Sequence, residues 1–141
     1  MVIHAAFRLA ITAFLLSASV CAAQEPDVDC ENAMTQMDMN ICADRDYQEA
    51  DVALNAAYKK ALSAAREMDD GVADLGENYV GAADALKRAQ RAWIGYRDGQ
   101  CEFAGFGARG GSMEPPLVSS CLADLTRKRT VELKAGYEQE N

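Results

Sequence analysis

The chain has 141 residues, and its 22 acidic side chains outnumber 14 basic ones for a net charge of −8. This balance disfavours nucleic acid as a partner, because proteins bind it with clustered Lys and Arg that displace counterions. Half of the residues are hydrophobic, and the length suits one domain with one core rather than two domains.

The first 23 residues have the features of a secretory signal peptide. Basic or titratable His4 and Arg8 precede an apolar run over 9–16, and small residues end the segment at Ala23. The run is shorter than the ~20 residues of a membrane-spanning helix, and no later stretch is long and apolar enough to span. We expect cleavage at Ala23, to within one or two residues, and a soluble helical domain over 24–141 in the periplasm or the medium.

Cys21 gives an alternative interpretation of this leader, as the lipid-bearing residue of a lipoprotein. Such sites usually have Leu three residues before the cysteine and Gly or Ala directly before it. Ala18 and Val20 occupy these positions here, so we expect no lipid anchor.

Four cysteines remain after the leader, an even number in a chain bound for an oxidising compartment, which predicts two disulfides. They are Cys30, Cys42, Cys101 and Cys121. Zinc is disfavoured because no C-x2-C pair is present and the one histidine, His4, lies in the leader. We expect neither a metal nor a cofactor.

The helical segments follow one another without a strand pattern. Thr35 and Asp38 predict a helix start, after which apolar residues recur at steps of three and four as far as Met68. A turn over 71–78 separates this helix from a second one over about 80–104.

The rest of the chain predicts a loop and a third helix. Four glycines and two prolines indicate a loop over 105–116, and Ser119 or Ser120 can cap a helix that continues to about Tyr137. The predicted fold is therefore all-α, a small antiparallel bundle of three main helices, with a long first and second helix, stapled by two disulfides.

Polar residues on the apolar stripes predict the register of the first two helices. Facing residues of antiparallel neighbours have a constant sum of residue numbers, so placing Asp51 opposite Arg97 also places Tyr58 opposite Gln90. This register predicts a half-buried salt bridge and an amide–phenol pair between the helices. It also packs Trp93 and Tyr58 into the core, which is favoured over a platform that binds carbohydrate or protein. Tyr96 lies off the stripe, where it can be exposed.

The same register brings all four cysteines to one end of the bundle. Local pairing, Cys30 with Cys42 and Cys101 with Cys121, closes the shorter loops and is favoured. Pairing of Cys42 with Cys101 and of Cys30 with Cys121 also fits this geometry.

The residues do not assemble a catalytic centre. A Ser–His or Cys–His pair needs a histidine, and none follows the leader. No two carboxylates are distinguished as the acid–base pair of a glycosidase. We therefore expect a protein that is not an enzyme.

The glycine-rich segment has two interpretations that are compatible with each other. A phosphate loop is disfavoured, because no Gly-Lys-Ser/Thr follows and no strand precedes. The segment is a connector that needs positive φ at several glycines, or it forms an exposed binding loop held at its base if Cys101 and Cys121 are joined. The residues of this candidate loop are Arg109, Gly110, Gly111, Ser112, Met113 and Glu114.

Several motifs recur in a fixed order over nearly the whole predicted mature chain. They are Cys30, T-Q-M-D-M-N-I-C over 35–42, D-x-x-L-N-x-x-Y over 51–58, Q-R-A-W-I-x-Y-R-x-x-x-C over 90–101, G-G-S over 110–112 and C-L-x-x-L-T-x-x-R-x-x-x-L over 121–133. This order resembles the lysozyme inhibitor LprI-like N-terminal domain family. We expect structural roles for the polar and aromatic residues of the motifs, namely Asp51, Asn55, Tyr58, Gln90, Trp93, Arg97 and Arg129.

The resemblance implies a secreted or envelope-attached bacterial domain that inhibits lysozyme. Lysozymes are commonly basic, and loss of Arg8 with the leader brings the net charge of this chain from −8 to −9. Complementary charge speeds encounter and favours the right partner. We expect a protein partner, a lysozyme, bound through the acidic surface and residues 109–114. The alternative is an envelope structural or adaptor module that binds another periplasmic protein.

Overall fold

The computed structural model describes residues 27–138. The predicted leader over 1–23, its cleavage at Ala23 and the alternative lipidation at Cys21 lie outside these residues. The described part consists of helices and connections without a strand, as predicted. Its elements are η1 (Cys30–Asn32), α1 (Gln36–Gly71), η2 (Ala73–Leu75), α2 (Ala82–Gly105), η3 (Phe106–Ala108) and α3 (Glu114–Glu138).

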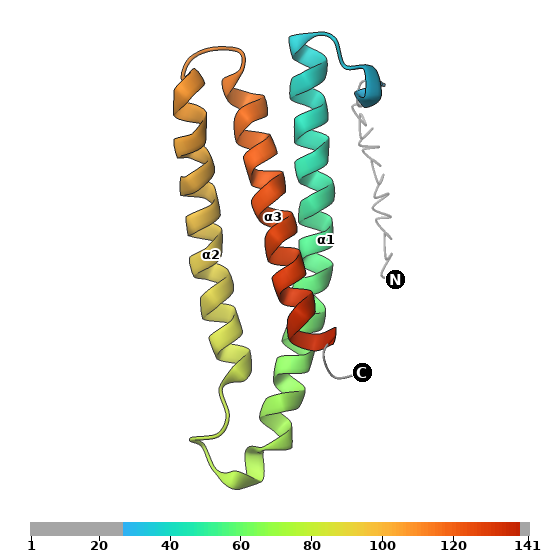
Figure 1. Cartoon of the computed structure of the whole chain (residues 1–141). Helices are drawn as coiled ribbons and strands as arrows, with labels where there is room; N and C mark the ends of the chain where they lie inside the picture. Colours follow the sequence, from blue (N-terminus) through green and yellow to red (C-terminus); the bar gives the residue numbers. More distant parts are fainter. Residues whose placement is uncertain (1–26, 139–141) are drawn as a thin grey trace, which may run out of the picture.

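The three long helices form an up-down-up bundle. α1 and α2 run antiparallel and are joined by a hairpin, and α3 returns between them, antiparallel to α2 and parallel to α1 (Figure 1). The closest packing is between α1 and α3, and α2 contacts both of its neighbours. Within 27–138, no helix has a stretch long and apolar enough to cross a bilayer.

Small residues on the inner face of α1 allow α3 to approach it closely. The buried core consists of Leu54, Ala57, Ala61 and Leu133. Tyr58, Leu86, Trp93 and Tyr137 pack against this cluster and are partly buried. The predicted core positions of Tyr58 and Trp93 are therefore confirmed, and Tyr96 is exposed as its place off the stripe indicated.

The predicted start of α1 is confirmed by a capping box. The Thr35 hydroxyl accepts a hydrogen bond from the Asp38 N–H at 3.1 Å, and the Asp38 carboxylate accepts one from the Thr35 N–H at 3.3 Å. Both bonds satisfy N–H groups that have no partner within the helix.

The predicted start of α3 at Ser119 or Ser120 is wrong, because α3 begins at Glu114. Pro115 and Pro116 occupy its first turn, where a missing N–H removes no helical hydrogen bond. The predicted loop over 105–116 is correspondingly shortened to residues 109–113, since α2 and η3 extend to Ala108.

The hairpin between α1 and α2 is closed by the carboxylate of Asp69, a contact that was not predicted from the sequence. Asp69, near the end of α1, accepts hydrogen bonds from the N–H groups of Gly81, Ala82 and Ala83 at 2.7, 2.7 and 3.0 Å. The last turn of one helix thus caps the first turn of the next. Gly81 supports this geometry with a φ of 132°, which residues with a side chain rarely adopt.

Candidate protein-binding surface

Both disulfides lie at the end of the bundle where α1 begins, as predicted. Cys30 is joined to Cys42, which ties η1 to α1, and Cys101 is joined to Cys121, which ties α2 to α3. The local pairing is therefore the one present. The start of α1, the end of α2 with η3, residues 109–113 and the start of α3 together form what we call the cysteine-end surface.

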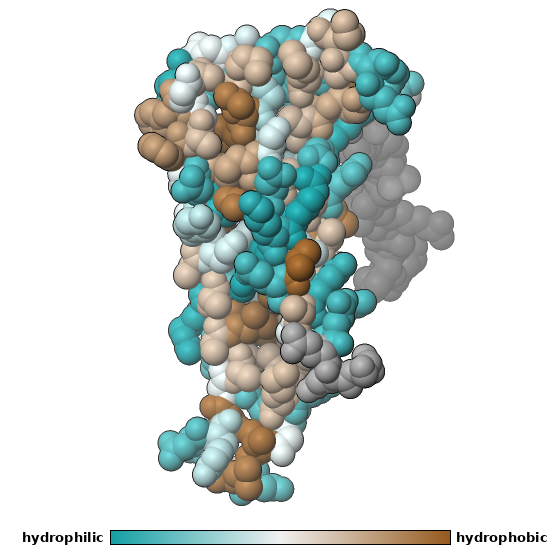
Figure 2. All heavy atoms as spheres, in the orientation of Figure 1, coloured by the Kyte–Doolittle hydropathy of each residue, from teal (hydrophilic) through white to brown (hydrophobic). Residues whose placement is uncertain are grey.

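Large apolar side chains are exposed on the cysteine-end surface. They are Met34, Met37, Phe103, Phe106, Met113 and Leu117, of which Phe103 is 72% exposed. Figure 2 shows brown atoms at this end, where α2 ends and α3 begins. Clustered exposed apolar residues of a soluble domain often mark an interaction site.

The candidate loop is closed by its own charges. Arg109 Nη1 lies 2.6 Å from Glu114 Oε1, and the other oxygen of Glu114 accepts a hydrogen bond from the Gly110 N–H at 2.7 Å. The Arg109 guanidinium also lies 4.3 Å from the centre of the Phe106 ring and 3.6 Å from Glu102. The loop is therefore braced by contacts within the protein itself.

These contacts shift the titration of both charged residues. The pKa of Glu114 is lowered by the hydrogen bond from the Gly110 N–H and then by Arg109. The pKa of Arg109 is raised by Glu114. Both shifts favour the charged pair that closes the loop.

The remaining loop residues connect to their surroundings. Gly111 donates its N–H to the Ala108 carbonyl at 2.8 Å, and Ser112 donates to Gln36 Oε1 of α1 at 3.5 Å. Met113 is exposed. Of the expected positive φ values in the glycine-rich segment, only that of Gly110, at 75°, is present. The loop thus bridges the ends of all three helices.

A close contact between α2 and α3 supports the loop from beneath. Cys101 is fully buried, and a Cβ placed on Gly105 would lie 2.6 Å from Val118 Cγ2. Only glycine fits at this position without a shift of the Val118 side chain or of α3. The disulfide and the glycine together hold the two helix ends at a short separation.

The predicted salt bridge between Asp51 and Arg97 is present in the middle of the bundle. Arg97 Nη1 lies 3.5 Å from Asp51 Oδ1, while its Nε donates to Asp98 at 2.8 Å and Nη1 reaches Thr126 of α3 at 3.4 Å. Asn55 donates to the second oxygen of Asp51 at 2.8 Å. The guanidinium is therefore held by residues of all three helices.

Two aromatic rings complete the surroundings of Arg97. Its guanidinium carbon lies 5.4 Å from the centre of the Tyr47 ring and 5.2 Å from that of Trp93. Burial raises the pKa of the Tyr47 phenol. These contacts are consistent with a structural role for Arg97, because its Nε and Nη1 and its contacts with two rings are used within the bundle.

The predicted pair between Gln90 and Tyr58 is replaced by a contact with α3. Gln90 Oε1 accepts a hydrogen bond from Arg129 Nε at 3.1 Å, and Arg129 Nη1 pairs with Glu132 at 2.8 Å. The predicted register considered only the first two helices. α3 lies between them, and its Arg129 is the partner of Gln90. An ion pair of Asp46 with Arg127 further ties α1 to α3, and it was not predicted because neither residue interrupts an apolar stripe.

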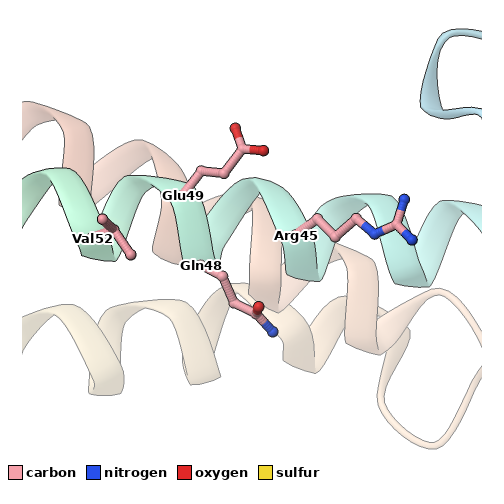
Figure 3. Close-up of a pocket in the computed structure, with 4 residues that line it drawn as sticks. All are labelled: Arg45, Gln48, Glu49 and Val52. Atoms are coloured by element: carbon pink, nitrogen blue, oxygen red, sulfur yellow. The ribbon is translucent and has the colours of Figure 1, made fainter. Parts of the chain in front are cut away.

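A separate concavity on the outer face of α1 offers no converging chemistry among the described residues. Its volume is about 460 Å3, and Arg45, Gln48, Glu49 and Val52 line it. All four lie on neighbouring turns of one helix, and Figure 3 shows Gln48 and Glu49 pointing to opposite sides. Arg45 donates to the Val28 carbonyl at 3.1 Å. Among residues 27–138, no group of three His, Cys, Asp or Glu side chains is placed to hold a metal.

Comparison with known proteins identifies the family. The family model of the lysozyme inhibitor LprI matches residues 29–133. A protein of Rhizobium meliloti (strain 1021), described as uncharacterized, is 58% identical over 129 residues, which are 92% of this chain and 93% of that protein. No solved structure matches the chain. Since the family model covers most of the sequence, the chain belongs to the lysozyme inhibitor LprI family.

Proposed function

We propose that this protein is an exported inhibitor without catalytic activity, which binds a basic lysozyme through the cysteine-end surface. The observation that carries the proposal is the braced loop over 109–114. One carboxylate oxygen of Glu114 contacts Arg109, and the other accepts a hydrogen bond from the Gly110 N–H. The family name supplies the enzyme class. The two disulfides and the family are consistent with a location outside the cytoplasm, and the predicted leader supplies a route of export.

The rigidity of this surface supports inhibition. A loop that keeps one shape loses little conformational entropy when a partner binds it. The Cys101–Cys121 disulfide and the contact of Gly105 with Val118 hold the base of the loop. A protruding loop of this kind suits the substrate cleft of an enzyme.

The chemistry of the surface also suits a basic protein. Phe103, Phe106 and the flexible side chains of Met37 and Met113 provide an apolar centre that can adapt to a partner. The net charge of −8 provides attraction at longer range. Apolar contacts then supply affinity, and charge supplies the rate and the choice of partner.

The direct test is lysis of bacterial cell walls by c-type and other lysozymes with increasing amounts of the oxidised protein. We expect a saturable loss of lysozyme activity near an equimolar ratio. A variant with a neutral linker in place of residues 109–114 should inhibit weakly. Val131→Ser, which changes an exposed apolar residue on α3 outside this surface, is the matched control and should inhibit normally.

The outcomes separate the proposal from the alternative of an adaptor module. No inhibition of and no binding to any lysozyme would contradict the proposal and favour a different periplasmic partner. Normal inhibition by the linker variant would support the inhibitory activity but show that residues 109–114 do not make the contact.

A further inference from the structure

The opposite end of the bundle is not covered by α3. α1 and the hairpin extend past the end of α3 at Glu138 (Figure 1). The last turns of α1 therefore extend beyond the cover of α3, while the first turn of α2 borders the last turns of α3. We call residues 64–86 the hairpin end.

A cleft opens on the hairpin end where α3 stops. Its volume is about 260 Å3. Its lining is mostly apolar, from Ala61, Ala64, Ala65, Met68, Ala82, Leu86, Leu133 and Gly136, and it also includes the ion pair of Arg129 with Glu132. This volume is below the ~300–1,000 Å3 of sites for drug-sized ligands, so the cleft suits side chains of a protein segment better than a small molecule. Small lining residues also let a backbone approach closely.

Exposed apolar side chains continue from the cleft onto the hairpin. Leu75 and Tyr79 are each 64% exposed, and Val80 and Met68 are exposed as well. Figure 2 shows brown and teal atoms next to each other at this lower end. Tyrosine with aliphatic neighbours is a typical composition for the centre of a protein contact.

The charge of the hairpin end is mainly negative. Residues 64–86 contain six acidic side chains against one basic one, Arg66. Asp69 is used to cap α2, whereas Asp70, Asp74 and Glu77 are exposed. The cap ties the end of α1 to the start of α2, and the exposed carboxylates lie on the hairpin between these two points.

We propose that the hairpin end binds a cationic amphipathic helix of another protein, laid against the last turns of α1 and the hairpin, beside the end of α3. Its apolar side chains, spaced three and four residues apart, would enter the cleft and contact Leu75 and Tyr79. Its Lys and Arg would face Asp70, Asp74 and Glu77. This occupant fits because the last turns of α1 extend beyond the cover of α3 and the charge of the hairpin end is mainly negative.

The same charge argues against two other occupants. A second copy of this chain carries a net charge of −8, which opposes association of two acidic ends. A membrane with anionic lipids attracts basic surfaces and repels an acidic one. The site is separate from the cysteine-end surface, so it does not depend on the proposed inhibition of lysozyme.

The test uses a fluorescent peptide of Leu and Lys whose order gives an amphipathic helix, and a peptide of the same composition in scrambled order. Fluorescence anisotropy with the oxidised protein should show saturable binding of the ordered peptide, weaker binding of the scrambled one, and weaker binding at high salt. The double variant Leu75→Ser/Tyr79→Ser should weaken binding about tenfold or more. The variant Asp70→Asn/Asp74→Asn/Glu77→Gln should weaken it and reduce its dependence on salt.

Phe103→Ser, at the far end of the bundle, is the control and should bind the peptide normally. Circular dichroism and thermal unfolding check that each variant is folded. Equal binding of both peptides, or equal losses in Phe103→Ser and the hairpin variants, would overturn the proposal. Loss of lysozyme inhibition in the hairpin variants would also overturn it, because the hairpin end would then be the lysozyme contact.

Discussion

Arg97 Nη1 lies 3.5 Å from Asp51 Oδ1, yet the two side chains differ in exposure, at 9% for Arg97 and 40% for Asp51. The guanidinium is enclosed by three helices, while the carboxylate reaches solvent at the edge of the bundle. The pair is therefore asymmetric, and its two partners are not equivalent when one of them is removed.

We predict that Arg97→Ala destabilises the protein by about 2–4 kcal/mol, because it removes buried packing, two ring contacts and hydrogen bonds to Asp98 and Thr126. Asp51→Ala should cost about 1 kcal/mol or less, since the pair is half exposed and Arg97 keeps Asp98. Urea unfolding of the oxidised protein measures both values. Equal costs would show that the ion pair, rather than the packing of Arg97, dominates.

A double variant tests the same cluster from the acidic side. Asp51→Ala/Asp98→Ala removes both carboxylates that contact Arg97 and leaves a buried cation without a counter-charge. We expect its cost to exceed the sum of the two single costs, because either carboxylate alone can balance the guanidinium. Simple additivity would contradict this shared role.

The sequence predicted those parts of the fold that depend on local or pairwise rules. The start of α1 follows from Thr35 and Asp38 alone, because a capping box is complete within four residues. The pair of Asp51 with Arg97 follows because each charge interrupts an apolar stripe. The start of α3 at Glu114 was not predictable in this way, since two prolines indicate a break everywhere except in a first turn.

The candidate surfaces depend on how three helices pack together. The apolar stripe of a single helix does not predict this arrangement. Gln90 pairs with Arg129 because α3 lies between α1 and α2. The exposure of Phe103 and Phe106 was equally hidden, because aromatic residues near a helix end are commonly packed against a neighbour. The cover of the hairpin end depends on where α3 ends along α1, and the sequence of α1 alone does not predict that position.

The cap that Asp69 provides for α2 should depend on pH. Hydrogen bonds from the N–H groups of Ala83, Gly81 and Ala82 lower the pKa of Asp69 from its ordinary value of 3.8. A carboxyl group whose pKa is lower in the folded state contributes stability above its unfolded pKa and loses it as the pH falls through the folded pKa. The contribution of Asp69 is therefore complete at neutral pH and disappears below about pH 4.

Thermal unfolding followed by circular dichroism tests this at several pH values. Asp69→Ala should lower the melting temperature at neutral pH, and the difference from the unchanged protein should shrink as the pH falls below about 4. Asp70→Ala, which alters the neighbouring exposed carboxylate, is the control and should show a smaller difference. A constant difference for Asp69→Ala at every pH would mean that its charge has no part in the cap.

The two disulfides should contribute similarly to stability but differently to inhibition. They close loops with sequence separations of 12 and 20 residues, and each should stabilise the protein by about 3 kcal/mol through restriction of the unfolded chain. Cys101→Ala/Cys121→Ala should also release the base of the loop and weaken inhibition. Cys30→Ala/Cys42→Ala should retain more inhibition at temperatures where both variants are folded. Equal inhibition by the two variants would show that the Cys101–Cys121 disulfide does not support the lysozyme contact.

The contact between α2 and α3 gives a prediction that can be tested by adding a single methyl group. Gly105 has helical backbone angles, so alanine is compatible with its conformation, but the new Cβ would lie 2.6 Å from Val118 Cγ2. Valine has a short, stiff side chain and cannot move aside easily. Gly105→Ala should therefore destabilise the protein by about 1–3 kcal/mol, as overpacking usually does.

Gly99→Ala is the matched control, because it lies in the same helix and its Cβ would meet no atom within 4 Å. It should stabilise α2 by up to about 1 kcal/mol through higher helix propensity. The double variant Gly105→Ala/Val118→Ala should recover part of the loss, since it removes the methyl group that the new Cβ meets. If Gly105→Ala were as stable as Gly99→Ala, the ends of α2 and α3 would be able to separate at little cost, and the loop over 109–114 would lack its rigid base.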